Sequence, residues 1–315
     1  MAVYTKLDKK QIEKIIEDYN LGKLTEYQGI TKGIMNTNYL LKTTNGKYIL
    51  RILEGKRDLK FEKEELKFLS FLNDNDIPCP NVLRNKKGED YFFVENKMSA
   101  IFSFLEGKEV ETITEKILYE FGEMLAKMHN LSKNKILIRN EKIELNYLLN
   151  ELLVDEKKLK GILKENYEII MNKINKVKTM DMEKLPKGII HNDIFPDNVF
   201  SKNGEISGII DFNDAMTDVF IHDIAIVLNF WIYNNFGEYK KIYVNAFLEG
   251  YQSVRKLEKI EKENLNLSLD RAGLTFLFLR IFKFNFSKIE NEEREFKDYR
   301  DLLPLVLSKK DIKIL

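Results

Sequence analysis

The first hundred residues alternate between helical and strand-like patterns of apolar side chains. Apolar residues at helical spacing lie within Lys9–Tyr19 and predict an amphipathic helix. Three strand-like runs follow, at Leu24–Ile30, Asn38–Thr43 and Lys47–Leu53. The turn Thr44–Gly46 between the last two is typical of a β-hairpin. We therefore expect a helix followed by a β-meander.

The pattern beyond the meander predicts a helix and further short strands. Leucines at helical spacing predict a helix over Leu59–Leu72, and the prolines of Ile77–Pro80 interrupt the chain after it. Strand-like runs follow at Val82–Asn85, Tyr91–Val94 and Ser99–Gly107. We expect the last of these strands to end a small β-rich lobe.

From Thr114 onward the apolar spacing is helical almost throughout. His129 stands at the end of the first of these helices, where we expect it to cap the helix. The very apolar segment Ile224–Tyr233 is too short to span a membrane and predicts a buried helix. We expect an α/β (α+β) chain with a β-rich lobe over residues 1–104 and a larger, mainly helical lobe over 105–315.

Composition narrows the class of protein. A chain of 315 residues exceeds one ordinary core and favours two lobes. Its 51 basic and 50 acidic residues give a net charge of +1, so no global field favours nucleic acid or a membrane. The single cysteine, Cys79, excludes an intramolecular disulfide framework and a cysteine-rich zinc site. No apolar signal core or membrane-length run is present, and we expect a cytoplasmic protein.

A polar loop between apolar segments carries the strongest chemical signal. After Gly188–Ile190 the loop offers Asp193 and, five residues later, Asn198. A hairpin at Lys202–Glu205 leads to a second carboxylate, Asp211, at the end of another apolar run. This spacing resembles the H-R-D-x-x-x-x-N loop and D-F-G motif of protein kinases. There, one carboxylate accepts a hydroxyl proton, while an amide and the second carboxylate hold magnesium on nucleotide phosphates.

The motif predicts phosphoryl transfer from ATP. We expect Asp193 to be the catalytic residue and Asn198 and Asp211 to bind Mg²⁺. Carboxylates beside apolar strands are costly to bury unless they are paired or bound to a cation, which argues against a purely structural role. Residues 1–104 would then bind the nucleotide, and residues 105–315 would supply the catalytic and substrate-binding groups.

Further candidates for nucleotide binding lie in the first lobe. Arg51 interrupts an apolar strand where kinases place a phosphate-pairing lysine. We expect it to pair with Glu62 or Glu65 of the following helix, preferably Glu65. An edge-strand arginine that reaches solvent is the alternative. The other candidates are polar or backbone groups, namely Gly33, Asn36 and Asn38 for the phosphates and the backbone of Ser103 and Leu105 for the adenine edge.

The motif and several separate stretches resemble the aminoglycoside phosphotransferase and choline kinase group, which has a protein-kinase-like, two-lobed fold. Within it, the closer likeness is to bacterial homoserine kinases and runs over nearly the whole chain. The stretches that carry it, besides the motif, are Thr31–Tyr39, Gly46–Leu50, Ser103–Gly107, Asp223–Ala225 and Ala246–Arg255.

The resemblance implies an ATP- and Mg²⁺-dependent kinase that phosphorylates a small-molecule alcohol. L-homoserine would be the acceptor and O-phospho-L-homoserine the product, on the route to threonine. Choline, methylthioribose, hydroxylysine and aminoglycosides stay open as alternative acceptors. A catalytically inactive binding module would be expected to lose Asp193, Asn198 or Asp211, and all three are present.

The chain departs from the family on the acceptor side. It has Asn213 where the family usually has an aromatic residue, and Phe230 where an acidic residue precedes Trp231. Arg280 resembles an arginine of the corresponding family helix and could bind the substrate carboxylate or form an interhelical ion pair. The resemblance thus implies Asn213, Trp231 and Arg280 as substrate residues.

Overall fold

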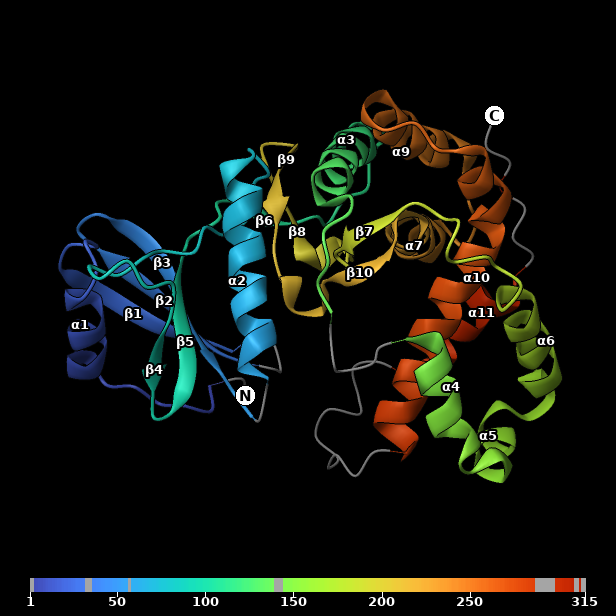
Figure 1. Cartoon of the computed structure of the whole chain (residues 1–315), viewed down its shortest axis with the longest axis horizontal. Helices are drawn as coiled ribbons and strands as arrows, with labels where there is room; N and C mark the ends of the chain where they lie inside the picture. Colours follow the sequence, from blue (N-terminus) through green and yellow to red (C-terminus); the bar gives the residue numbers. More distant parts are fainter. Residues whose placement is uncertain are drawn as a thin grey trace. The chain divides into compact units, whose positions relative to one another are not determined.

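The computed structural model describes residues 3–31, 36–55, 58–138, 144–286, 298–308 and 312. The chain divides into two compact units (Figure 1). The first comprises residues 1–108, 200–202 and 207–213, and the second comprises residues 109–199, 203–206 and 214–315. The division therefore falls at residue 108 rather than at residue 104, and two later segments return to the first unit.

The first unit is built on a five-stranded antiparallel sheet with strand order β1-β2-β3-β5-β4. The expected helix, meander and second helix are all present, so the local patterns were sufficient to predict them. The elements are α1 (Lys9–Glu17), β1 (Leu24–Ile30), β2 (Asn36–Thr43), β3 (Gly46–Leu53), α2 (Leu59–Asp74), β4 (Phe92–Val94) and β5 (Lys97–Ser103).

A polar cluster ties the N-terminal segment to the ends of the central strands. The Glu54 carboxylate accepts hydrogen bonds from the hydroxyls of Thr5 and Thr37, each at 2.6 Å. Its other oxygen accepts one from Lys97 Nζ at 2.6 Å. Burial opposes ionisation of Glu54, but the bonds from Lys97 and the two threonines outweigh it and lower its pKa. The cluster fixes β2, β3 and β5 relative to one another at one end of the sheet.

Three expectations for the first unit are wrong at the level of single strands. Val82–Asn85 forms no strand; only an isolated bridge joins Val82 to Phe102. β5 ends at Ser103 rather than at Gly107, and Asn36 begins a strand instead of belonging to a loop. Pairing with a partner strand decides these boundaries, and the local pattern does not contain that partner.

A small three-stranded sheet has the order β6-β8-β9, and its strands contribute residues to both units. Gly107 and Gly208 have φ of +124° and +155°, and a Cβ at either would meet a backbone oxygen, Ser201 O or Pro78 O, within 2.7 Å. Glycine is therefore required at both places. The strands are β6 (Lys108–Glu109), β8 (Val199–Lys202) and β9 (Glu205–Ile209).

The second unit is mainly helical and contains one antiparallel strand pair, β7 (Lys187–Ile190) with β10 (Met216–Val219). None of its described helices, nor any other described helix of the chain, is long and apolar enough to cross a membrane. The α-helices are α3 (Glu115–Ser132), α4 (Leu145–Leu153), α5 (Glu156–Leu163), α6 (Tyr167–Val177), α7 (Phe220–Val227), α8 (Asn234–Phe236), α9 (Lys241–Val254), α10 (Lys259–Ile281) and α11 (Leu303–Leu307). The remaining helical turns are η1 (Lys164–Asn166), η2 (Pro196–Asn198), η3 (Phe212–Asp214), η4 (Leu228–Tyr233), η5 (Phe282–Phe286) and η7 (Tyr299–Leu302).

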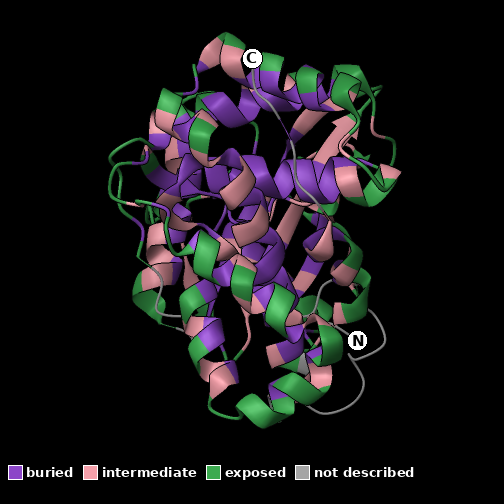
Figure 2. Cartoon of the chain, turned by 90° about the vertical axis from the view of Figure 1, so that its right-hand side faces the viewer, coloured by how far each residue is buried: buried purple, intermediate pink, exposed green. Residues whose placement is uncertain are grey.

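The core of the second unit surrounds α7 and the π-helical turn η4 that continues it. Every residue of α7 is buried, which confirms the buried helix expected from the apolar run. Outer helices such as α5 and α6 are buried along one face only, and Figure 2 shows this contrast between buried and exposed residues. A π turn is rare and often lies at a functional site, and here it directly follows α7.

Two glycines allow α3 and α9 to pack with their backbones in close contact. A Cβ at Gly122 on α3 would overlap the carbonyl oxygen of Phe247, and one at Gly250 on α9 would overlap that of Tyr119. Figure 1 shows the two helices side by side. The absence of both side chains therefore sets the distance between them.

Replacing Gly250 with alanine should destabilise the protein by roughly 2 kcal/mol or more, because the helices must move apart. Gly161→Ala is the matched control: it also lies in a helix, α5, but a Cβ there meets nothing within 4 Å. The control should be neutral or stabilising, by up to about 1 kcal/mol. Thermal unfolding of both variants measures the difference, and equal melting temperatures would contradict the close-packing explanation.

Candidate active site

The loop that carries Asp193 leaves β7 through a strained residue. β7 is buried over Gly188–Ile190 and pairs with β10, so its end is fixed by the core. Asn192 then has φ +66°, in the left-handed region that asparagine tolerates better than most residues. The loop ends in the single turn η2, where Asn198 N donates to Phe195 O at 3.0 Å. The turn brings Asn198 back toward Asp193.

Asp223, in the first turn of α7, holds this loop by its backbone. Its two carboxylate oxygens accept hydrogen bonds from His191 N and Asn192 N, both at 2.9 Å. Asp223 therefore fixes the loop through its backbone. Burial opposes ionisation of Asp223, but hydrogen bonds from His129 and from the His191 backbone outweigh it and lower its pKa.

Asp193 and Asn198 are joined directly. The Asn198 amide nitrogen donates to Asp193 O at 2.7 Å and to Asp193 Oδ2 at 2.9 Å. Both amide hydrogens are thereby used, so the amide oxygen of Asn198 is directed away from the Asp193 carboxylate. His191 Nδ1 accepts from Asp193 N at 3.3 Å, which further restricts the loop.

Trp231 is buried in the core, where it supports the same loop and does not contact a substrate. Its side chain is 0% exposed, and its indole N–H donates to Ile194 O at 2.8 Å. Its ring stacks on Phe121 with centroids 4.6 Å apart. The expectation that Trp231 is a substrate residue is therefore wrong, because its one polar atom is already bonded within the core.

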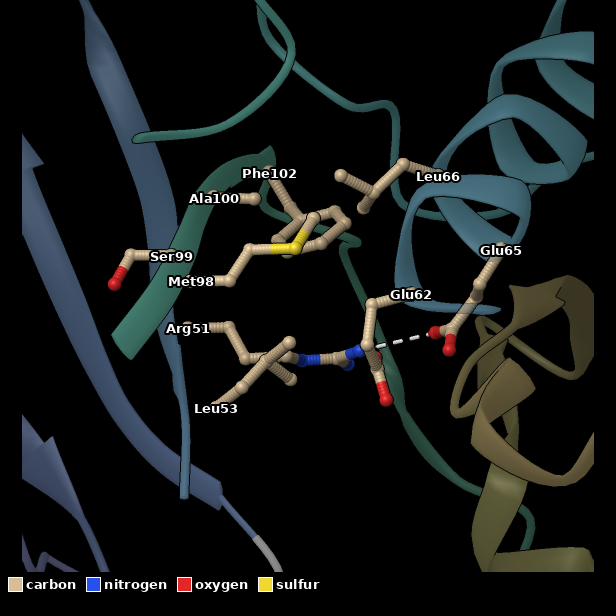
Figure 3. A pocket seen from close by; sticks show the side chains of 9 residues that line it. All are labelled: Arg51, Leu53, Glu62, Glu65, Leu66, Met98, Ser99, Ala100 and Phe102. Carbon is tan, nitrogen blue, oxygen red and sulfur yellow. Dashed lines mark hydrogen bonds and ion pairs between the residues drawn. The ribbon is translucent and has the colours of Figure 1, made fainter. Parts of the chain in front are cut away.

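In the first unit, Arg51 pairs with Glu65, the glutamate that the sequence favoured. Arg51 Nη1 lies 3.4 Å from Glu65 Oε1, and the Glu65 side chain is only 3% exposed. The guanidinium carbon also lies 4.9 Å from the ring centroid of Phe102. Figure 3 shows Arg51 extending from β3 toward α2 in a small pocket that Glu62, Met98 and Phe102 help to line.

Asn38 lies opposite Arg51 in the register of β2 and β3. Arg51 Nε and Asn38 Oδ1 are both buried and have no hydrogen-bond partner among the described residues. The orphaned N–H of Arg51 is a donor that a phosphate oxygen could complete, whereas Asn38 Oδ1 is an acceptor and would need a donor. Asn36 differs: it is 5% exposed and its amide oxygen accepts from Glu54 N at 3.5 Å, so it is assigned to holding the strand end rather than a phosphate. Gly33 lies outside the described residues.

Asp211 is placed by its neighbours in sequence. Its φ of +63° is strained for an aspartate, and Phe212 anchors the turn against Phe68 on α2, with ring centroids 6.1 Å apart. The Asn213 amide nitrogen donates to Asp211 Oδ1, and the Asn213 amide oxygen is buried without a partner among the described residues. Asn213 is therefore close enough to orient the Asp211 carboxylate.

The two residues expected at the adenine edge follow β5. The backbone N–H of Ser103 donates to Asn81 O at 2.9 Å, and its hydroxyl accepts from Asn81 N at 2.9 Å. The Ser103 N–H is therefore used within the unit, and a contact of the Ser103 backbone carbonyl with adenine stays a prediction. Leu105 is half-buried beside Gly208, and its backbone contact with adenine stays a prediction.

Arg280, near the end of α10, already has a protein partner. Its Nη1 donates to the backbone oxygen of Asp298 at 2.8 Å and lies 4.0 Å from an oxygen of Asp301. Burial lowers the pKa of Arg280, although Asp301 and Asp298 partly compensate. The ion pair that the sequence offered as an alternative is therefore present in weak form, and Nη1 is the guanidinium nitrogen that bonds to a described residue.

Sequence reasoning missed a group of buried residues behind the loop. His129 does not cap α3: it is 0% exposed and its ring nitrogens contact Tyr251 and Asp223. Arg255 and Glu261 continue this group toward the start of α10. The spacing of Tyr251 and Arg255 on one helix face was the only local signal, and it does not reveal a partner on α3.

The donor set fits magnesium rather than a transition metal. Asp211 and Asn198 offer carboxylate and amide oxygens, the ligands that Mg²⁺ prefers. Among the described residues, no group of three or more His, Cys, Asp or Glu side chains could hold a metal ion. Magnesium does not require such a group, because phosphate oxygens and water usually complete its shell.

Comparison with known proteins agrees with this chemistry. The phosphotransferase enzyme family (APH) matches residues 26–257. A homoserine kinase of Agrobacterium fabrum is 34% identical over 286 residues, covering 90% of this chain and 88% of its own length. A homoserine kinase of Gluconobacter oxydans is 30% identical and covers 90% of each protein.

Solved structures support the fold. An amicoumacin kinase in complex with AMP-PNP, Ca²⁺ and Ami has a TM-score of 0.70 at 15% identity, covering 95% of this chain and 93% of its own. A microcompartment-associated aminopropanol kinase has a TM-score of 0.66 at 18% identity, covering 95% of both. The expected kinase-like fold is therefore confirmed. From its sequence and its fold together, the chain belongs to the phosphotransferase enzyme family.

Proposed function

We propose that this protein transfers the γ-phosphoryl group of ATP to the hydroxyl of L-homoserine, giving O-phospho-L-homoserine and ADP for threonine biosynthesis. One observation carries the chemistry: Asp193 and Asn198 are hydrogen-bonded on a loop that Asp223 holds by its backbone. The acceptor is inferred from the relatives named homoserine kinase, which match 90% of the chain. A cytoplasmic location stays a prediction.

Asp193 is assigned to the acceptor hydroxyl. As the hydroxyl oxygen forms its bond to the γ-phosphorus, the hydroxyl proton passes to the Asp193 carboxylate, and the bond from phosphorus to ADP breaks. The hydrogen bond from Asn198 to Asp193 Oδ2 fixes the carboxylate plane for this transfer. A positioned general base contributes on the order of 10²–10⁴-fold to the rate.

Asn198 and Asp211 are assigned to Mg²⁺, and Arg51 and Asn38 to the phosphates. Bound magnesium neutralises charge on the transferring phosphoryl group. The amide oxygen of Asn198 is directed away from Asp193, as a ligand role requires. The unpartnered Nε of Arg51 supports a phosphate role, because a buried guanidinium donor is costly to leave unpaired.

The aromatic residues of the second unit argue against choline as the acceptor. A quaternary ammonium needs open aromatic faces around it. The rings of Phe195, Phe230 and Phe276 instead pack on one another, with centroid separations of 4.6, 4.9 and 5.1 Å. Phe230, which replaces the acidic residue expected from the family, is thus part of a closed apolar cluster.

An ADP-release assay across homoserine, choline, methylthioribose, hydroxylysine and kanamycin should give the highest kcat/KM with homoserine. The reason is that an amino acid can offer its carboxylate to a buried guanidinium, whereas the other acceptors lack the matching pair of charges or the size. Faster turnover of choline than of homoserine would exclude the amino-acid acceptor while leaving phosphoryl transfer intact.

Asp193→Asn should lower kcat by about 10²–10⁴-fold while ATP affinity stays near that of the wild type, because the carboxylate acts in the transition state. Asp197→Asn is the control, since this exposed residue lies in the same loop. Steady-state kinetics and ATP titration measure both effects. If Asp193→Asn kept more than about a tenth of the rate, or the control lost as much, another group would be the base.

Arg280→Met should raise the homoserine KM at least tenfold with little change in ATP affinity, if its remaining donors bind the substrate carboxylate. A buried carboxylate without a partner costs several kcal/mol. Arg280→Lys keeps the charge and should recover part of the loss. Unchanged KM together with a lower melting temperature in the absence of substrate would instead assign Arg280 to holding Asp298.

A further inference from the structure

A continuous buried polar chain runs from the junction of α9 and α10 to the backbone of the Asp193 loop. Glu261 accepts hydrogen bonds from Nη1 and Nη2 of Arg255, each at 3.0 Å. Arg255 Nη1 lies 3.1 Å from the Tyr251 hydroxyl, which lies 2.7 Å from His129 Nδ1. His129 Nε2 lies 3.2 Å from Asp223 Oδ2. Its five side chains are all at most 8% exposed.

The chemistry of these groups fixes the direction of every hydrogen bond. A guanidinium can only donate, so the Tyr251 oxygen accepts from Arg255 and its single proton goes to another acceptor. That acceptor is His129 Nδ1, which therefore carries no proton. Neutral His129 is then protonated at Nε2 and donates to Asp223. The order of these hydrogen bonds therefore determines which ring nitrogen of His129 carries the proton.

Burial favours the charge states that this order requires. It lowers the pKa of His129 even though Asp223 acts in the opposite direction, so the imidazole stays neutral. It also raises the pKa of Tyr251, so the hydroxyl keeps its proton. The ionised ends, Arg255 and Asp223, are thus connected by two neutral groups that each donate toward the carboxylate.

We propose that Tyr251 is a positioning residue for phosphoryl transfer: its hydroxyl donates to His129 Nδ1 and holds the imidazole so that Nε2–H completes the hydrogen bonding of Asp223. The ionised Asp223 can only accept, so it keeps the proton on Nε2 without Tyr251 as well, but Nδ1 is then a buried acceptor that has lost its donor. The ring must shift to recover that bond, which disturbs the carboxylate that also holds His191 N and Asn192 N. Asn192 has a strained φ of +66° and stays there only while its surroundings hold it.

The location of Tyr251 makes the proposal specific. Tyr251 lies on α9, and its contact with the loop that bears Asp193 runs through His129 on α3 and Asp223 on α7. A small displacement of a reacting group can change a rate by about 10²-fold. Loss of the hydroxyl should therefore affect turnover more than nucleotide binding.

The test is Tyr251→Phe, which removes one oxygen and no charge. The chain has three histidines, so ¹⁵N-histidine labelling gives few signals, and loss of a signal in His129→Gln assigns His129. We expect the Nε2–H tautomer in both the wild type and Tyr251→Phe, and in the variant we expect the ¹⁵N signal of His129 Nδ1 to move to that of a nitrogen without a hydrogen bond. With the best acceptor, kcat should fall roughly tenfold or more while the KM for ATP stays within about twofold.

Tyr167→Phe is the matched control. Its hydroxyl donates to Glu156 at 2.7 Å in the same unit, but that contact lies outside the chain from Arg255 to Asp223. It should change neither the His129 signal nor kcat. Circular dichroism of each variant at the assay temperature shows that the compared proteins are folded.

Two outcomes would overturn the inference. In one, Tyr251→Phe keeps both the wild-type Nδ1 signal of His129 and the wild-type kcat. In the other, kcat falls while the Nδ1 signal is unchanged, which would assign Tyr251 to packing alone. The kinetic part rests on the proposed function and the role of Asp193. If the wild type phosphorylated no acceptor, the proposed function would fail, while the Nδ1 signal would still decide what Tyr251 does to His129.

Discussion

The carboxylate of Asp223 is the interaction on which the proposed chemistry depends. It accepts two backbone hydrogen bonds from His191 and Asn192, and a third from the His129 ring. A buried carboxylate is stable only when its oxygens are satisfied. The N–H groups of the loop satisfy the Asp223 carboxylate, and the same hydrogen bonds fix the loop. They therefore also determine the position of Asp193.

Two residues with strained backbone lie beside the proposed catalytic groups. Asn192 and Asp211 both have positive φ, a conformation that costs on the order of 1–3 kcal/mol and persists only where neighbouring contacts enforce it. Asp223 enforces it at Asn192, and the packing of Phe212 on Phe68 supports it at Asp211. The rigid surroundings are therefore part of the site. They hold Asn192, which precedes Asp193, and Asp211 in conformations that an isolated loop would leave.

Local sequence signals were sufficient for some features and insufficient for others. Hydrophobic periodicity and turn residues predicted the β-meander and the helix α2, and the charge within an apolar strand predicted the pair of Arg51 and Glu65. The same signals misassigned His129, and the family resemblance misassigned Trp231. Periodicity indicates that such a side chain faces the core, but the partner that uses its polar atom lies on another helix.

The sequence by itself determined the phosphoryl-transfer chemistry and the order of the elements, because motif spacing and apolar pattern are local properties of the chain. The tertiary structure alone decided which polar groups are already bonded. The backbone N–H of Ser103 and the indole N–H of Trp231 are bonded to backbone oxygens, and Tyr251 and Arg255 are connected to the Asp193 loop. The physical reason is that a buried donor or acceptor must find a partner, and folding alone determines which one lies within reach.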